Sequence, residues 1–131
     1  MSEKKTSDWR VERRWTPLLA QKFCPVASPF LEYYHRFKLN STEAMLIIHL
    51  MEFKWDEKAP FPTVGTLATR MGITRRAVRN ALKSLEEEPK ALLKREATLY
   101  GPNRYDMTPL FEKLEKIVSE EKSKSSSEEA A

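Results

Sequence analysis

Apolar side chains recur at helical spacing in several stretches of the chain. The first clear stretch predicts a helix from Asn40 to about Trp55, because Asn40 followed by Glu43 has the spacing of an N-terminal capping box. This helix is apolar over most of its surface, so we expect it at the centre of the core. A second, short helix is predicted between Thr63, its capping residue, and Gly72, which readily adopts the left-handed conformation that ends helices.

A third helix and a β-hairpin are predicted to follow. The helix is expected from its capping residue Thr74 to about Glu87, because a proline two positions later cannot continue it. Segments 91–98 and 104–107 are predicted to pair as strands, since the turn-forming segment 101–103 (Gly-Pro-Asn) lies between them.

Weaker patterns predict the elements at the two ends of the chain. Segment 30–37 is rich in aromatic residues and is predicted to be a short helix. Segment 23–26 is predicted to be a short strand. Its proline would fit only at the edge of a sheet. A last helix is expected after its capping residue Thr108, with a proline in the first turn and an apolar stripe behind it. From Ser119 onward, the composition is typical of a solvated tail.

The spacing between residues 64 and 82 is that of a helix-turn-helix. A small residue, Ala68, allows the second and third helices to cross closely, and Gly72 makes the tight turn between them. Ile73 and Val78 are expected to fill the angle that the helices form. Followed by a hairpin, this pattern predicts a mainly α-helical fold with a small β-hairpin, the winged helix-turn-helix.

The length of 131 residues suits one domain with extensions at its ends. We therefore divide the chain into an N-terminal basic and aromatic arm (1–21), a winged helix-turn-helix domain (22–118) and a disordered polar tail (119–131). The net charge is +4, and residues 63–108 alone carry nine bases and five acids. The positive charge is therefore concentrated around the predicted helix-turn-helix, which favours a polyanionic partner.

The third helix is predicted to have one basic and one apolar face. At about 100° per residue, counted from Arg75, the polar side chains fall within roughly 140° and the apolar ones between roughly 200° and 340°. The basic face holds Arg75, Arg76, Arg79, Asn80 and Lys83. The apolar face holds Ala77, Val78, Ala81, Leu82 and Leu85.

The basic face fits the major groove of duplex DNA. Arginine donates two hydrogen bonds to guanine, asparagine pairs with adenine, and recognition helices read bases mainly from their N-terminal half. The free N–H groups after Thr74 suit a phosphate, and Lys83 is also better placed for a phosphate. In the hairpin, the candidates for the adjacent backbone or minor groove are Lys94, Arg95 and Arg104. The alternative for both elements is a charged surface that only faces water.

The residue order also resembles a known family. Segments 39–43, 61–63 and 67–79, followed by 103–110 at the end of the hairpin, resemble the winged helix-turn-helix proteins of bacteria, phages and plasmids. The resemblance covers about residues 22–118. It implies base contacts from the third helix through Thr74, Arg75, Arg76, Arg79 and Asn80. Such relatives include transcription regulators and replication initiators, so the resemblance does not decide the biological role.

Other chemistry receives little support from the sequence. The two histidines, His35 and His49, do not lie in a cluster with metal-ligand spacing. His49 is expected to be a packed or boundary residue of the predicted core helix rather than a catalyst. A lone cysteine, Cys24, cannot form an internal disulfide, and no glycine-rich phosphate loop occurs. No apolar run is long enough for a bilayer, and the start of the chain lacks a secretory signal. We expect a cytoplasmic protein without catalytic activity, metal or cofactor.

The leading hypothesis is a sequence-specific duplex-DNA-binding regulator of transcription. It places the third helix, about 74–87, in the major groove and the hairpin wing on the backbone. The alternatives are a replication initiation or partition accessory protein of a plasmid or phage, and a winged-helix protein-interaction module. The last helix (Phe111, Leu114, Val118) or the arm (Trp9 to Trp15) could form a homodimer. The alternative is that both segments pack on their own domain.

Overall fold

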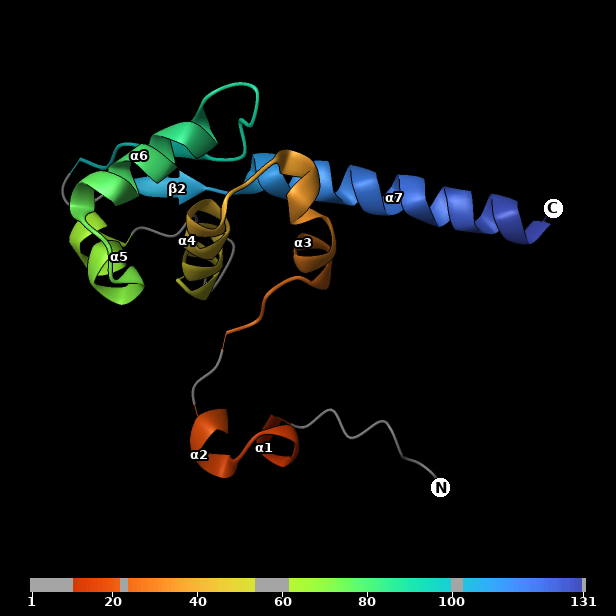
Figure 1. Ribbon diagram of the computed structural model, residues 1–131, viewed down its shortest axis with the longest axis horizontal. Helices are drawn as coiled ribbons and strands as arrows, with labels where there is room; N and C mark the ends of the chain where they lie inside the picture. Colours follow the sequence, from red (N-terminus) through yellow and green to blue (C-terminus); the bar gives the residue numbers. More distant parts are fainter. Residues whose placement is uncertain (1–10, 22–23, 54–61, 100–102, 131) are drawn as a thin grey trace.

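The computed structural model describes residues 11–21, 24–53, 62–99 and 103–130. Helices dominate, and one two-stranded antiparallel sheet accompanies them, as the sequence predicted (Figure 1). The elements are α1 (Val11–Arg14), α2 (Pro17–Ala20), α3 (Ser28–Tyr33), the 3-10 helix η2 (Tyr34–Phe37), α4 (Ser41–Glu52), α5 (Val64–Met71), α6 (Arg75–Glu86), β1 (Lys94–Glu96), β2 (Arg104–Asp106) and α7 (Thr108–Ala130).

Helix α4 is the central helix of the core, as predicted. Its capping box is formed: the Asn40 side chain accepts from the Glu43 N–H at 2.8 Å, and the Asn40 N–H donates to Glu43 Oε1 at 3.0 Å. The helix ends at Glu52, earlier than expected, with Phe53 as its C-terminal cap. The fully buried residues of the core come from α3 to α7 and the loop before β1: Phe30, Leu46, Ile47, Leu50, Leu67, Val78, Leu85, Leu92 and Leu110.

The next two helices begin and turn as the sequence predicted. Thr63 caps α5 by accepting from the Thr66 N–H at 3.0 Å, and Thr74 caps α6 by accepting from the Ala77 N–H at 3.0 Å. Gly72 ends α5 with a φ of +66°, a left-handed conformation that suits a residue without a Cβ.

The wing is shorter than predicted. Strands β1 and β2 have three residues each, with Arg95 opposite Tyr105 in an antiparallel register. The residues before β1 pair elsewhere, because the Leu92 N–H donates to the carbonyl of Leu85 at 2.8 Å and the Leu92 carbonyl accepts from the Leu110 N–H at 3.1 Å. Of the predicted turn, residues 101 and 102 lie outside the described residues.

Helix α7 corrects two expectations at the end of the chain. It runs from Thr108 to Ala130, through the segment predicted to be a disordered tail. No proline or glycine follows Pro109, so nothing in the sequence breaks the helix, and Glu121 pairs with Arg36 of η2 at 3.0 Å. The cap differs as well, because the Asp106 side chain accepts from the Thr108 N–H at 2.9 Å.

The N-terminal part also departs from the prediction. Segment 30–37 is helical as expected, divided between α3 and η2. The edge strand expected at 23–26 is wrong for its described residues 24–26, which pair with neither strand of the hairpin. Helices α1 and α2 lie apart from the rest of the domain (Figure 1). Of the predicted N-terminal arm, residues 1–10 lie outside the described residues.

Candidate DNA interface

Helices α5 and α6 form the helix-turn-helix. Leu67 and Ala68 of α5 and Val78 of α6 are buried between them, and Ile73 in the turn is half-buried. The Ile73 N–H donates to the carbonyl of Ala68 at 3.1 Å, which closes the end of α5. The residues predicted to set the crossing of these helices therefore do so.

The two predicted faces of α6 are confirmed as geometry. The five polar side chains are all exposed: Arg75, Arg76, Arg79, Asn80 and Lys83. On the opposite face, Ala77 is half-buried and the other four residues are buried: Val78, Ala81, Leu82 and Leu85. The apolar face thus fixes the rotation of α6 and turns its basic face to solvent.

The start of α6 is an electropositive end. The Thr74 hydroxyl is engaged as a cap, so its oxygen accepts from the Ala77 N–H. The first N–H groups of any α-helix lack an intrahelical acceptor, and here Arg75 and Arg76 occupy the first two positions. The first turn contains no acidic residue, so the helix dipole and two guanidinium groups act with the same sign.

Arg75 has a neighbour that the sequence analysis missed. A Cβ added at Gly65 would lie 3.2 Å from Arg75 Nη2, so the guanidinium lies against the first turn of α5. Only a glycine at this position leaves full room for that approach. Arg75 therefore belongs to the junction of the two helices, whereas Arg76 and Arg79 project from α6 alone.

The wing residues are placed unequally. Lys94 and Arg95 are exposed on β1, whereas Arg104 on β2 is half-buried. Arg95 Nε on β1 lies 3.4 Å from Glu86 Oε1 at the end of α6. The sequence did not predict this contact. It turns the Arg95 side chain toward α6 of its own domain.

Tyr105 joins the wing to the hydrophobic core. It is buried on β2, directly opposite Arg95 in the register. Burial raises the pKa of Tyr105, and the Glu86 carboxylate raises it further, while Arg95 and Asn103 act in the opposite direction. The wing therefore rests on an aromatic side chain that stays protonated at neutral pH.

A buried polar cluster holds the other end of α6. Glu43 of α4 is buried, and Lys90 Nζ donates to both of its carboxylate oxygens at 2.9 Å. Lys90 Nζ also donates to Ser84 Oγ on α6 at 3.0 Å. Burial raises the pKa of Glu43, but hydrogen bonds from Ser84, Lys90 and Asn40 outweigh this effect and lower it. We call Glu43, Ser84 and Lys90 the Glu43 cluster.

A second set of contacts links the ends of α4 and α5. Arg70 pairs with Glu52 and lies over the ring of Phe53, 4.8 Å from its centroid. His49, predicted to be a packed residue, is half-buried on α4. Burial lowers the pKa of His49, and the nearby Arg70 charge lowers it further. These groups fasten the helix-turn-helix to the central helix.

No group of three or more histidine, cysteine or carboxylate side chains in the described part of the chain has the arrangement of a metal site. None of the described helices has the length and apolarity to cross a membrane.

Comparison with known proteins gives one family and one fold. The profile of the DnaD N-terminal domain family matches residues 26–125. No curated protein sequence matches the chain. The chain is similar to the crystal structure of the N-terminal domain of DnaD protein from Geobacillus kaustophilus HTA426, with a TM-score of 0.63 and 23% identity. That alignment covers 88% of this chain and 96% of the other, and it shows a shared fold.

Proposed function

The chain belongs to the DnaD N-terminal domain family, and we propose that it binds duplex DNA as a replication initiation or accessory protein. In this proposal, α6 lies in the major groove, and the wing lies on the adjacent backbone. The protein acts by occupying DNA, without catalysis, metal or cofactor. Of the two DNA-binding roles that the sequence left open, we favour replication because the family match is to a DnaD domain.

The observation that carries the proposal is the basic face of α6. Five donor-bearing side chains, Arg75, Arg76, Arg79, Asn80 and Lys83, are exposed together on a helix whose other face is buried. Arg76, Arg79 and Asn80 are the residues that we assign to base edges. Arg75, held near the start of α5, and Lys83 are assigned to phosphates, together with the N–H groups that follow Thr74.

The wing is given a smaller part. Lys94 is exposed and is assigned to the DNA backbone, and Arg104 is assigned to the same surface. Arg95 is assigned there too, but its contact with Glu86 means that it must leave or share this carboxylate to reach a phosphate. We expect its contribution to affinity to be the smallest of the three.

The test is a charge reversal on α6 with a matched control. Binding of a pool of random duplexes is measured by fluorescence anisotropy for R75E/R79E and for K116E/K124E, which makes the same change of charge on α7. A protein that neutralises phosphates loses affinity steeply with salt, so the titration is repeated across salt concentrations. We expect R75E/R79E to lose at least ~100-fold in affinity, since each reversed contact is worth roughly 1–3 kcal/mol.

Three results are informative. Selective loss in R75E/R79E supports the DNA interface. Equal loss in both variants indicates non-specific attraction to a basic protein and contradicts the assignment to α6. No binding by the unaltered protein removes the DNA proposal and leaves the protein-interaction module as the better hypothesis.

Selection of duplexes from the same pool then addresses specificity and symmetry. Enrichment of one sequence, bound at least ~1,000-fold better than random DNA, indicates a specific initiator or regulator. A palindromic winner with half-sites about one helical turn apart indicates a homodimer on DNA. Weak and salt-steep binding without an enriched sequence indicates an architectural role.

A further inference from the structure

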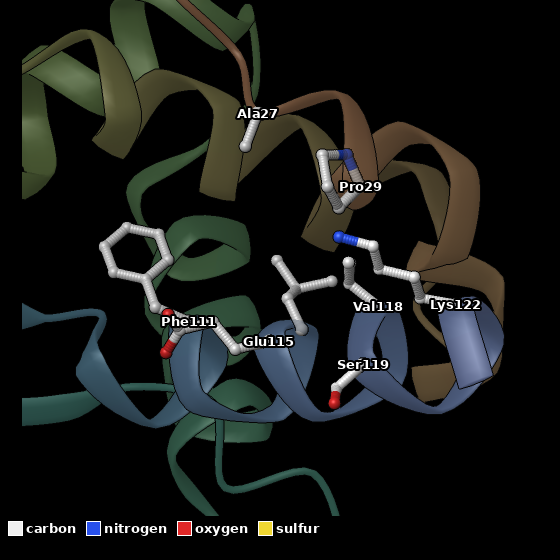
Figure 2. A pocket seen from close by; sticks show the side chains of 8 residues that line it. Ala27, Pro29, Phe111, Glu115, Val118, Ser119 and Lys122 are labelled. Carbon is white, nitrogen blue, oxygen red and sulfur yellow. The ribbon is translucent and has the colours of Figure 1, made fainter.

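Two hollows beside α7 differ in character. One lies against the start of α3, encloses about 840 Å³ and is lined mainly by apolar side chains, among them Pro29, Phe111 and Val118 (Figure 2). The other encloses about 390 Å³ and lies between η2, the segment that follows α6 and the second turn of α7. Its lining residues are Arg36, Phe37, Lys38, Pro89, Lys90 and Lys113. We call this second hollow the basic pocket.

The basic pocket has an excess of positive charge. Four of its six lining residues are cationic, and none of the six is acidic. Two carboxylates contact these cations, since Glu121 pairs with Arg36 at 3.0 Å and Glu43 pairs with Lys90 at 2.9 Å. The two acidic residues at 87–88 line a neighbouring hollow instead. Four cations against two carboxylates leave two positive charges without a counter-charge.

Lys113 has a fixed charge that its partners do not neutralise. Its Nζ donates to the backbone carbonyls of Lys90 at 2.7 Å and of Ala91 at 3.1 Å, which hold the ammonium in place but carry no charge. An ammonium has three donors, so one of them remains for a ligand. Lys90, in contrast, donates to both carboxylate oxygens of Glu43 and to Ser84, which uses all three.

The backbone beside the pocket is unusual at two positions. Lys38 and Ala91 have φ angles of +59° and +44°, a region that residues with a Cβ seldom adopt. Lys38 is also the C-terminal cap of η2, a position at which glycine has this conformation at lower cost. Left-handed residues other than glycine cluster at functional sites. Both lie at the basic pocket, because Lys38 lines it and the Ala91 carbonyl accepts from Lys113.

We propose that the basic pocket binds a nucleotide through its terminal phosphate. Lys38 and Lys113 hold the phosphate, and the base lies against Phe37 and Pro89. A phosphate monoester carries a charge of about −1.5 to −2 at pH 7, which balances the two positive charges that remain in the pocket. A phosphodiester inside a strand carries only one negative charge and leaves the other cation unbalanced.

The size and lining of the pocket favour a nucleotide over phosphate alone. Sites for small organic ligands enclose roughly 300–1,000 Å³, and a volume of about 390 Å³ lies within this range. A phosphate leaves most of this space empty. Phe37, which is half-buried, and Pro89 offer the remaining space an apolar wall, against which a flat base packs.

The pocket is separate from the duplex interface proposed above. It follows the C-terminal end of α6, and none of the five polar residues of the basic face lines it. The same terminal phosphate occurs on a free mononucleotide and on the phosphorylated end of a DNA strand. Both sources are therefore tested.

The experiment is isothermal titration calorimetry of the full chain with deoxyadenosine monophosphate (dAMP). We expect a Kd on the order of 10–100 μM, as is usual for a ligand of this size. K38N/K113M removes both phosphate contacts and should bind at least ~10-fold more weakly. The matched control is K122M/K124N, which removes two exposed lysines of α7 outside the pocket and should stay within about twofold.

A single variant separates binding from folding, because K113M also removes two hydrogen bonds to the backbone. Lys38 is exposed, and asparagine accepts the left-handed conformation, so K38N should keep its Tm and still lose at least ~3-fold in affinity for dAMP. R75E/R79E should bind dAMP as the unaltered protein does. Failure of the duplex proposal therefore leaves this one standing, and loss of dAMP binding in R75E/R79E would place the nucleotide on α6 instead.

A short single strand with and without a 5′-phosphate distinguishes the two sources. Binding of the phosphorylated strand at least ~10-fold better than of the other, lost in K38N/K113M, shows that the pocket takes a strand end. Binding of dAMP without this preference shows that it takes a free nucleotide.

Three results overturn the proposal. The first is no binding of dAMP or of the phosphorylated strand at about 1 mM, a concentration well above the expected Kd. The second is an equal loss of affinity in K38N/K113M and K122M/K124N. The third is equal affinity for dAMP and inorganic phosphate, which would show that the base makes no contact.

Discussion

Removal of Lys90 from the Glu43 cluster should have a large and pH-dependent effect on stability. In K90M, the side chain keeps an unbranched stem one atom shorter than that of lysine and loses the ammonium that donates to both Glu43 oxygens at 2.9 Å. Breaking a fully buried pair by removing one partner costs about 3–5 kcal/mol. The Glu43 side chain is only 4% exposed, but that of Lys90 is 21% exposed, so water partly replaces it. We therefore expect a loss of roughly 2–3 kcal/mol at pH 7, or about 10 °C in Tm.

The sign of the pH dependence follows from the pKa of Glu43. Although burial raises this pKa, the surrounding hydrogen bonds lower it below 4.5, so the ionised carboxylate contributes stability above pH 4.5 that is lost as the pH falls through the folded-state pKa. Without Lys90, burial dominates and Glu43 gains a proton readily. The difference in unfolding free energy between the unaltered protein and K90M should therefore be largest at neutral pH. It should shrink as the pH falls from the raised pKa of Glu43 in K90M to its lowered pKa in the unaltered protein.

Urea unfolding followed by circular dichroism measures both effects at pH 7 and pH 4. E43Q and E43Q/K90M complete a double-mutant cycle, in which the two losses should be clearly less than additive. If K90M loses under about 1 kcal/mol at pH 7, or loses the same amount at both pH values, the pair does not stabilise the fold as a buried ion pair. Additive losses would also contradict direct coupling.

Two further predictions concern the turn and the wing. Gly72→Ala should lower the free energy of unfolding in urea by about 1 kcal/mol, because Gly72 has a φ of +66°, although no atom would clash with the new Cβ. Gly65→Ala should be neutral or stabilising, since only the flexible end of Arg75 must move. Equal effects at the two glycines would refute the conformational argument. Tyr105 has a raised pKa, chiefly from burial, so its neutral form contributes stability that is present below pH 10 and lost as the pH rises through the folded-state pKa. Y105F should lack this alkaline loss in thermal melts from pH 9 to 11, and an unchanged profile would show that Tyr105 does not cause it.

The elements that the sequence predicted well are the ones that depend on local spacing. The box formed by Asn40 and Glu43 and the caps at Thr63 and Thr74 each join residues three positions apart, so the pattern contains the whole interaction. The left-handed Gly72 is local as well. Once these boundaries are known, helical periodicity alone assigns the two faces of α6.

The features that the sequence did not predict depend on contacts between distant residues. Glu43 and Lys90 are 47 positions apart, and nothing in either neighbourhood indicates the other. The wing is shortened because the backbone of Leu92 forms hydrogen bonds with the end of α6 and the start of α7. The alternation of apolar and polar residues in a strand does not show which backbone partner a residue takes. Arg75 was expected to project freely from α6, and only the packing of α5 reveals that it lies against Gly65.

The structure separates the residues that hold α6 from those that face solvent. Its C-terminal end is held by the Glu43 cluster, and its start is fixed by the turn at Gly72. Twelve residues of helix put about 18 Å between these ends. Effects at sites this far apart are usually additive. K90M should therefore lower stability but leave DNA affinity within about twofold at temperatures well below unfolding. A larger loss would mean that the orientation of the Arg76 and Arg79 face is set by the far end of the helix, and not by its own buried side.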